Sequence, residues 1–156
     1  MNAVFALSAL VAVAATVLVI TRRNAVHALL YLVVSLLAVA VIMFLLGAAF
    51  VAALEVIIYA GAIMVLFVFV IMLIGHEGIA MNPRAWIGPS VLSAVLLAEL
   101  VWVLAGGHLT SSPVTEIGPK QVGIALFGPY LLGAEMAAFL LLAGLVGAFH
   151  LGRRSK

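Results

Sequence analysis

The chain has 156 residues, of which 68% are hydrophobic and 8% are charged, and its formal net charge is +2. Ordinary soluble domains carry roughly a quarter charged residues, so this composition excludes a soluble fold and predicts an integral membrane protein. The sequence contains no cysteine, which excludes disulfides and cysteine-ligated metal or iron–sulfur centres within the chain.

Five apolar segments follow one another along the chain. A transmembrane helix needs about 20 mostly apolar residues, and this requirement is met at 3–20, 26–46, 50–74, 86–105 and 130–151. The breaks between these segments are polar or contain glycine and proline, as is typical of turns and loops. The sequence therefore predicts an all-α integral membrane bundle of five transmembrane helices that forms a single membrane domain, residues 1–156.

The cationic residues predict how the bundle is oriented. With five spans the two termini lie on opposite sides of the membrane, and six of the seven Lys and Arg residues fall on the C-terminal side. The other side receives Lys120 alone. Because Lys and Arg concentrate on the cytoplasmic side of membrane proteins, we expect the N-terminus outside and the C-terminus inside.

Three carboxylates lie within the predicted spans: Glu55, Glu99 and Glu135. A charge at the bilayer centre costs about 2.5–3.5 kcal/mol on insertion scales, so such residues usually face a protein interior or a wet cavity. All three are candidates for a proton path. The alternatives are that Glu55 extends its carboxylate to the lipid headgroups, and that Glu99 only pairs with a neighbouring helix.

The third span combines several unusual residues at its head. Tyr59 follows Glu55 by four residues, which places both side chains on one helix face. Gly61 costs about 1 kcal/mol relative to alanine in a helix interior. The glycine therefore marks either close packing between helices or a local irregularity such as a π-bulge, and the residues alone leave both interpretations open.

Two long stretches carry a resemblance to a known family. The segment NAVHALLYLVVSLLAVAVIMFLLGAAFVAALEVIIYAGAIMVLFVFVIML, residues 24–73, resembles subunit J of the proton-pumping NADH–quinone oxidoreductase, respiratory complex I. The segment LFGPYLLGAEMAAFLLLAGLVGAFHLGRR, residues 126–154, is similar to the last helix of that family. The mitochondrial counterpart is NADH dehydrogenase subunit 6.

The resemblance implies a role without redox chemistry in this chain. It implies a multi-pass subunit of the bacterial inner (plasma) membrane that belongs to an H⁺-translocating NADH:quinone oxidoreductase. It further implies that FMN, iron–sulfur clusters and quinone are held by other subunits, and that this chain holds no cofactor or metal. The alternative is an equivalent subunit of a related cation/proton antiporter or membrane-bound hydrogenase.

The same resemblance implies partners and a gate. The expected partners are the quinone-chamber subunit, subunit K, the antiporter-like subunits and the lipid bilayer, with no nucleic acid. In the family, the third helix is thought to switch between a regular helix and one with a π-bulge, here near residues 59–65. This switch would couple quinone reduction to proton translocation, and the residues carried over to it are Tyr59, Gly61, Met64 and Val65, with Glu55 close by.

Overall fold

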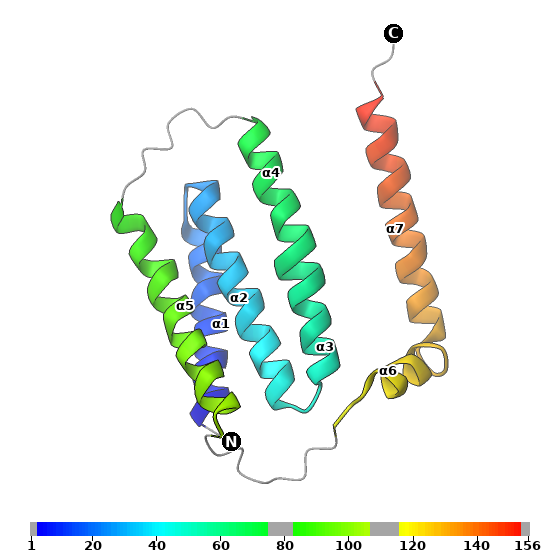
Figure 1. The fold of residues 1–156 in the computed structure, drawn as a ribbon. Coiled ribbons are helices and arrows are strands. Elements are labelled where there is room, and N and C mark those ends of the chain that lie inside the picture. The colour runs from blue at the N-terminus through cyan, green and yellow to red at the C-terminus, as the bar shows by residue number, and fades with distance from the viewer. Residues whose placement is uncertain (1–2, 75–82, 107–115, 154–156) are drawn as a thin grey trace. The chain divides into compact units, whose positions relative to one another are not determined.

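The computed structural model describes residues 3–74, 83–106 and 116–153, and the chain divides into two compact units, Met1–Glu116 and Ile117–Lys156. The first unit contains α1 (Ala3–Thr21), α2 (Ala25–Leu45), α3 (Ala49–Leu54), η1 (Glu55–Ile63), α4 (Met64–Ile74) and α5 (Pro83–Leu104) (Figure 1). The second contains α6 (Pro119–Leu126) and α7 (Leu131–Gly152).

The predicted fold class is confirmed. The described residues form helices and no strand, and five helices are long and apolar enough to cross a membrane. The third of these is the continuous helix α3–η1–α4, Ala49–Ile74, which contains a π-helical segment. The bounds agree with those predicted to within one residue, except that α5 begins at Pro83 instead of at residue 86.

The turns of the first unit follow from local residues. Asn24 precedes α2, and its side-chain Oδ1 accepts hydrogen bonds from the backbone N–H groups of Val26 and His27 at 3.0 and 3.4 Å. Such a cap satisfies donors that the first helical turn leaves unpaired. At the other end of α2, Gly47 has a φ of 84°, and the N–H groups of Gly47 and Ala48 donate to Phe44 and Met43. This pattern is a Schellman motif, which turns the chain directly into α3.

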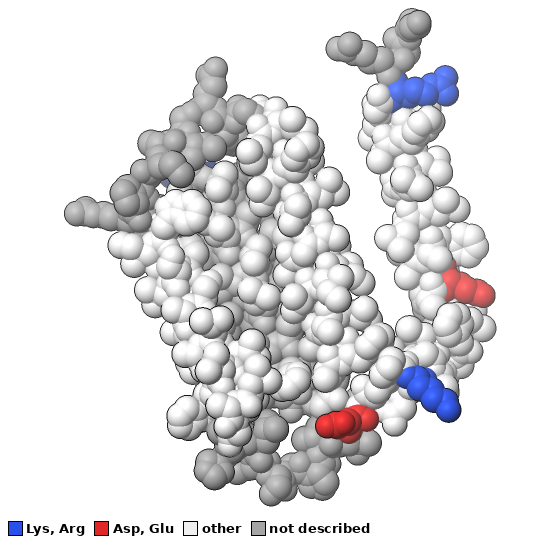
Figure 2. All heavy atoms as spheres, in the orientation of Figure 1, with Lys and Arg blue, Asp and Glu red and all other residues white. Residues whose placement is uncertain are grey.

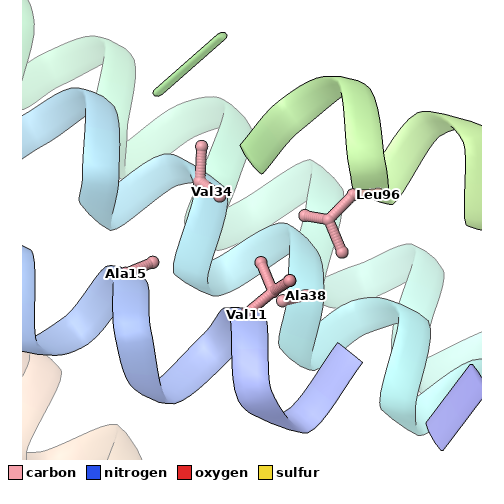
Figure 3. Close-up of a cluster of buried hydrophobic side chains, with 5 residues drawn as sticks. All are labelled: Val11, Ala15, Val34, Ala38 and Leu96. Carbon is pink, nitrogen blue, oxygen red and sulfur yellow. The ribbon is translucent and has the colours of Figure 1, made fainter. Parts of the chain in front are cut away.

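The core of the first unit is built from small and branched apolar side chains. The central helix α2 packs against α1, α5 and the continuous helix α3–η1–α4, and α1 also packs against α5. Figure 3 shows five buried residues where α1, α2 and α5 meet: Val11, Ala15, Val34, Ala38 and Leu96. Small residues allow helices to approach closely in lipid, where van der Waals packing drives their association.

A polar bridge crosses the same interface. The hydroxyl oxygens of Thr16 in α1 and Ser35 in α2 lie 2.8 Å apart. Both hydroxyl oxygens also lie within hydrogen-bond distance of the carbonyl oxygen of Ala12, at 2.8 Å for Thr16 and 3.3 Å for Ser35. Because each hydroxyl has one proton, one of them donates to the other and that other donates to Ala12. Hydrogen bonds of this kind join neighbouring membrane helices, so the bridge fixes the rotation of α1 relative to α2.

The second unit consists of a short helix followed by a long one. Gly118 precedes α6, and its N–H donates to the Gln121 side chain at 3.3 Å. No residue of α7 is buried within the described chain. Most of the face that Figure 2 shows carries neither Lys and Arg nor Asp and Glu side chains, as the low share of charged residues predicts.

Candidate functional site in the third membrane helix

The most unusual backbone of the described chain is η1, a nine-residue π-helical segment from Glu55 to Ile63. At its end the N–H of Met64 donates to the carbonyl of Tyr59, five residues earlier, and also to that of Gly61. π-Helical turns are rare and are found often at functional sites. The predicted π-bulge in the third span is confirmed, and it overlaps the expected range of residues 59–65. It begins four residues before that range, at Glu55, and ends at Ile63.

One feature of the local sequence separates this segment from the regular helix that follows it. EVIIYAGAI contains four β-branched residues and α4 contains five, so β-branching alone does not account for the π-helical geometry. EVIIYAGAI also contains Gly61, which has low helix propensity, whereas α4 contains no glycine. The flanking segment AFVAAL is rich in alanine and keeps regular α geometry.

Gly61 has a specific role in the π-helical geometry. A Cβ atom added at this residue would lie 3.1 Å from the backbone carbonyl oxygen of Val56. That separation is shorter than an ordinary van der Waals contact, and the atom that would have to move belongs to the backbone. The absence of a side chain therefore leaves room for the Val56 carbonyl oxygen in the widened π-helical turn. This reason for the glycine differs from close packing against a neighbouring helix.

The predicted site residues of this helix face different surroundings. Met64 is buried, with an exposed fraction of 2%, whereas Tyr59 and Val65 are 50% and 66% exposed. Glu55 and Gly61 are half-buried. Met64 is the first residue of α4, and it anchors the helix in the first unit immediately after the π-helical segment ends.

An apolar groove of about 480 Å³ adjoins the π-helical segment. Its floor is α2, and its walls come from α3 and the start of η1 on one side and from α5 on the other. Val56, whose carbonyl faces Gly61, lies in this wall, and Ser93 is the one polar residue in the lining formed by the described chain. The η1 backbone therefore has free space beside it within the isolated chain.

Glu99 lies at a separate place. It is 6% exposed and lines a smaller pocket formed by α1 and α5, next to Ser8. Ser8 was not among the predicted site residues, because a lone serine in an apolar run is a weak signal in the sequence. Its meaning follows only from the pairing of α1 with α5.

The remaining candidate, Glu135, lies on α7 in the second unit, where its side chain is exposed. Within the described residues there is no group of three or more His, Cys, Asp or Glu side chains that could hold a metal ion. The roles of all seven predicted site residues, and the prediction that this chain holds no cofactor, stay predictions.

Comparison with known proteins identifies relatives over the whole chain. Residues 15–151 match the family described as NADH-ubiquinone/plastoquinone oxidoreductase chain 6. NADH-quinone oxidoreductase subunit J of Escherichia coli is 50% identical, over 100% of this chain and 89% of the relative. The Pseudomonas aeruginosa protein of the same name is 51% identical over 99% and 98% of the two chains, and that of Buchnera aphidicola (subspecies Schizaphis graminum) is 47% identical over 100% of each.

Proposed function

Because the chain belongs to the family of NADH-ubiquinone/plastoquinone oxidoreductase chain 6, whose bacterial members are named subunit J, we propose that it couples quinone reduction to proton translocation through η1. It is a multi-pass membrane subunit of this oxidoreductase. The observation that carries the proposed mechanism is the π-helical segment in the third membrane helix.

The proposed motion is a change between π-helical and α-helical geometry in η1. A π-helical turn accommodates about one more residue than an α-helical turn, and an α-helix advances about 100° per residue. If α3 stays fixed, the conversion rotates α4 by roughly 100° about its axis. Ile63 then takes the inward direction that Met64 occupies in the π-helical form.

The side chains along this helix suit such a motion. Met64 is unbranched and flexible, so it can leave one packed position and fill another at small cost. Val65 is mostly exposed in the π-helical form and can move without breaking a core contact. The groove beside Val56 gives the backbone room for the change. In this proposal the rotation opens or closes a water path between the quinone-binding end of the assembly and its proton-translocating subunits.

Glu55 is the first residue of the π-helical segment, and we propose that it takes part in proton movement. Replacing Glu55 by glutamine keeps the size of the side chain and removes its ability to exchange a proton. We expect the Glu55→Gln variant to assemble at close to the wild-type level and to pump several-fold fewer protons. Proton uptake by inverted membrane vesicles, divided by the amount of assembled complex, measures this. Equal losses of assembly and pumping would assign Glu55 to packing.

The topology and partners remain part of the proposal. We propose an outer N-terminus and an inner C-terminus in the bacterial inner membrane, supported by the distribution of Lys and Arg. The proposed neighbours are the quinone-chamber subunit, subunit K and the antiporter-like subunits, with FMN, iron–sulfur clusters and quinone held elsewhere in the assembly. Glu135 on the exposed helix α7 would then face another subunit or water.

Purification of the native assembly in a mild detergent tests the function directly. We expect this chain to co-purify with flavin and iron–sulfur proteins and with NADH-dependent quinone reduction. Co-purification with a cation/proton antiporter or a hydrogenase would favour the alternative complex. Recovery as a free subunit with transport activity of its own would contradict both.

A further inference from the structure

Two polar groups are buried together between α1 and α5 without a hydrogen bond of acceptable geometry. Ser8 is fully buried and Glu99 is 6% exposed, and the Ser8 hydroxyl and backbone are the polar groups beside the Glu99 carboxyl. Within the described residues, the Ser8 Oγ and both carboxyl oxygens of Glu99 have no hydrogen-bond partner. A buried polar group without a partner is costly, so these three atoms need an explanation.

The described side chains of the helices around Glu99 offer no compensating charge. Glu99 lies on α5, which packs against α1 and α2. The sequence of α1 contains no titratable side chain. The titratable residues of α2 are His27 and Tyr31, in its first half, and Tyr31 contacts α5 near Gly88. Glu99 follows Gly88 by eleven residues, so it lies about 16 Å further along α5 at 1.5 Å per residue.

These surroundings fit a neutral carboxylic acid much better than a carboxylate. An ionised carboxylate out of water needs a cation or two to three hydrogen-bond donors, and Ser8 supplies one hydroxyl. A neutral acid needs one acceptor for its O–H. The Ser8 hydroxyl can accept that bond, because its Oγ has no hydrogen-bond partner within the described residues.

We propose that Glu99 and Ser8 form a proton-holding site, in which the carboxylic acid O–H of Glu99 donates to Ser8 Oγ and links α5 to α1. Glu99 also lines a pocket of about 340 Å³, although both of its carboxyl oxygens are buried within the described residues. Its other walls are apolar residues of α1 together with Val95, Ala98 and Trp102 of α5. The site does not depend on the η1 mechanism, because Glu99 and η1 line different cavities.

Infrared difference spectroscopy of the intact complex in lipid tests this assignment. In the spectrum of the wild type minus Glu99→Gln, all other carboxyl groups cancel, and we expect the C=O stretch of one protonated carboxylic acid. In Ser8→Ala we expect this band to move to higher frequency, because the acid has lost its partner. Ser93→Ala is the matched control, since Ser93 lies on the same helix α5 but lines the other groove, and it should leave the band in place.

The opposite results are equally clear. Bands of an ionised carboxylate in the wild type, or a C=O band that Ser8→Ala leaves unmoved, would overturn the proposal. We expect Glu99→Gln and the apolar variant Glu99→Met to assemble to within about twofold of the wild type, because neither removes a required charge. If both fail to assemble, the negative charge is needed and the proposal is wrong.

Discussion

Replacing Gly61 by valine is expected to lower coupled NADH-to-quinone turnover at least about fivefold. In the π-helical form the new Cβ would lie 3.1 Å from the carbonyl oxygen of Val56. Overpacking of this kind costs about 1–3 kcal/mol, which shifts an equilibrium by a factor of about 5 to about 150. A regular α-helix accepts valine at small cost, so the variant should favour the α-helical form and hold the proposed gate in one state.

The measurement compares two reactions of the same membranes. NADH oxidation by an artificial acceptor such as ferricyanide should stay at the wild-type level, because we propose that the flavin site lies in another subunit. Ala62→Val is the matched control. Ala62 follows Gly61 directly, is exposed and already carries a Cβ, so this variant introduces the same branched side chain without adding a Cβ beside Val56. Wild-type coupled turnover in Gly61→Val, or equal losses in both variants, would contradict a special role for Gly61.

The second large effect is expected at Gly88, where α5 meets α2. A Cβ added at Gly88 would overlap the hydroxyl oxygen of Tyr31, whose side chain is 2% exposed. The guanidinium group of Arg22, an exposed side chain, lies over the Tyr31 ring, 5.4 Å from its centroid. Because a buried ring has little freedom to move, we expect Gly88→Ala to destabilise the assembled subunit by about 1–3 kcal/mol.

A second substitution should reverse much of this effect. The atom of Tyr31 next nearest to the added Cβ is Cζ, at 3.1 Å, so Tyr31→Phe removes the overlapping atom and leaves a contact that a small shift can relieve. The amount of assembled complex in membranes, and the temperature at which it dissociates in detergent, should rise from Gly88→Ala to the double variant, with Tyr31→Phe alone as the control. If Gly88→Ala is as stable as the wild type, or the double variant is no better, the contact does not limit packing.

Much of the fold could be predicted because lipid imposes a strong and local requirement. Each span needs a continuous apolar run, and the runs at 3–20 and 26–46 end at polar or glycine-containing turns that the structure keeps. The sequence predicts the start of the fourth span at residue 86, three residues after α5 begins, because Pro83 and the residue after it are typical of a loop. Proline is in fact well suited to the first helical position, where its missing N–H would have no partner in any case.

The candidate site could be predicted only in part from the sequence. Gly61 was recognisable as a weak point, but the contact of its Cβ position with Val56 exists only in a particular backbone geometry. The resemblance indicated a π-bulge and displaced its bounds, since hydrogen-bond register is not encoded by any single residue. Ser8 and Gly88 gain their meaning from contacts between helices that are far apart in sequence, so no local pattern could identify them.

The measurement that tests the central claim most directly is the backbone register of the third membrane helix in the assembled complex at rest and during turnover. Electron cryomicroscopy can distinguish the two forms by the partner of the Met64 N–H, which is the Tyr59 carbonyl in the π-helical form. In the α-helical form that partner becomes the carbonyl of Ala60, four residues earlier. We predict both registers in the turnover sample, with the α-helical one enriched in Gly61→Val. A single register in every state and in both proteins would contradict the proposed gate.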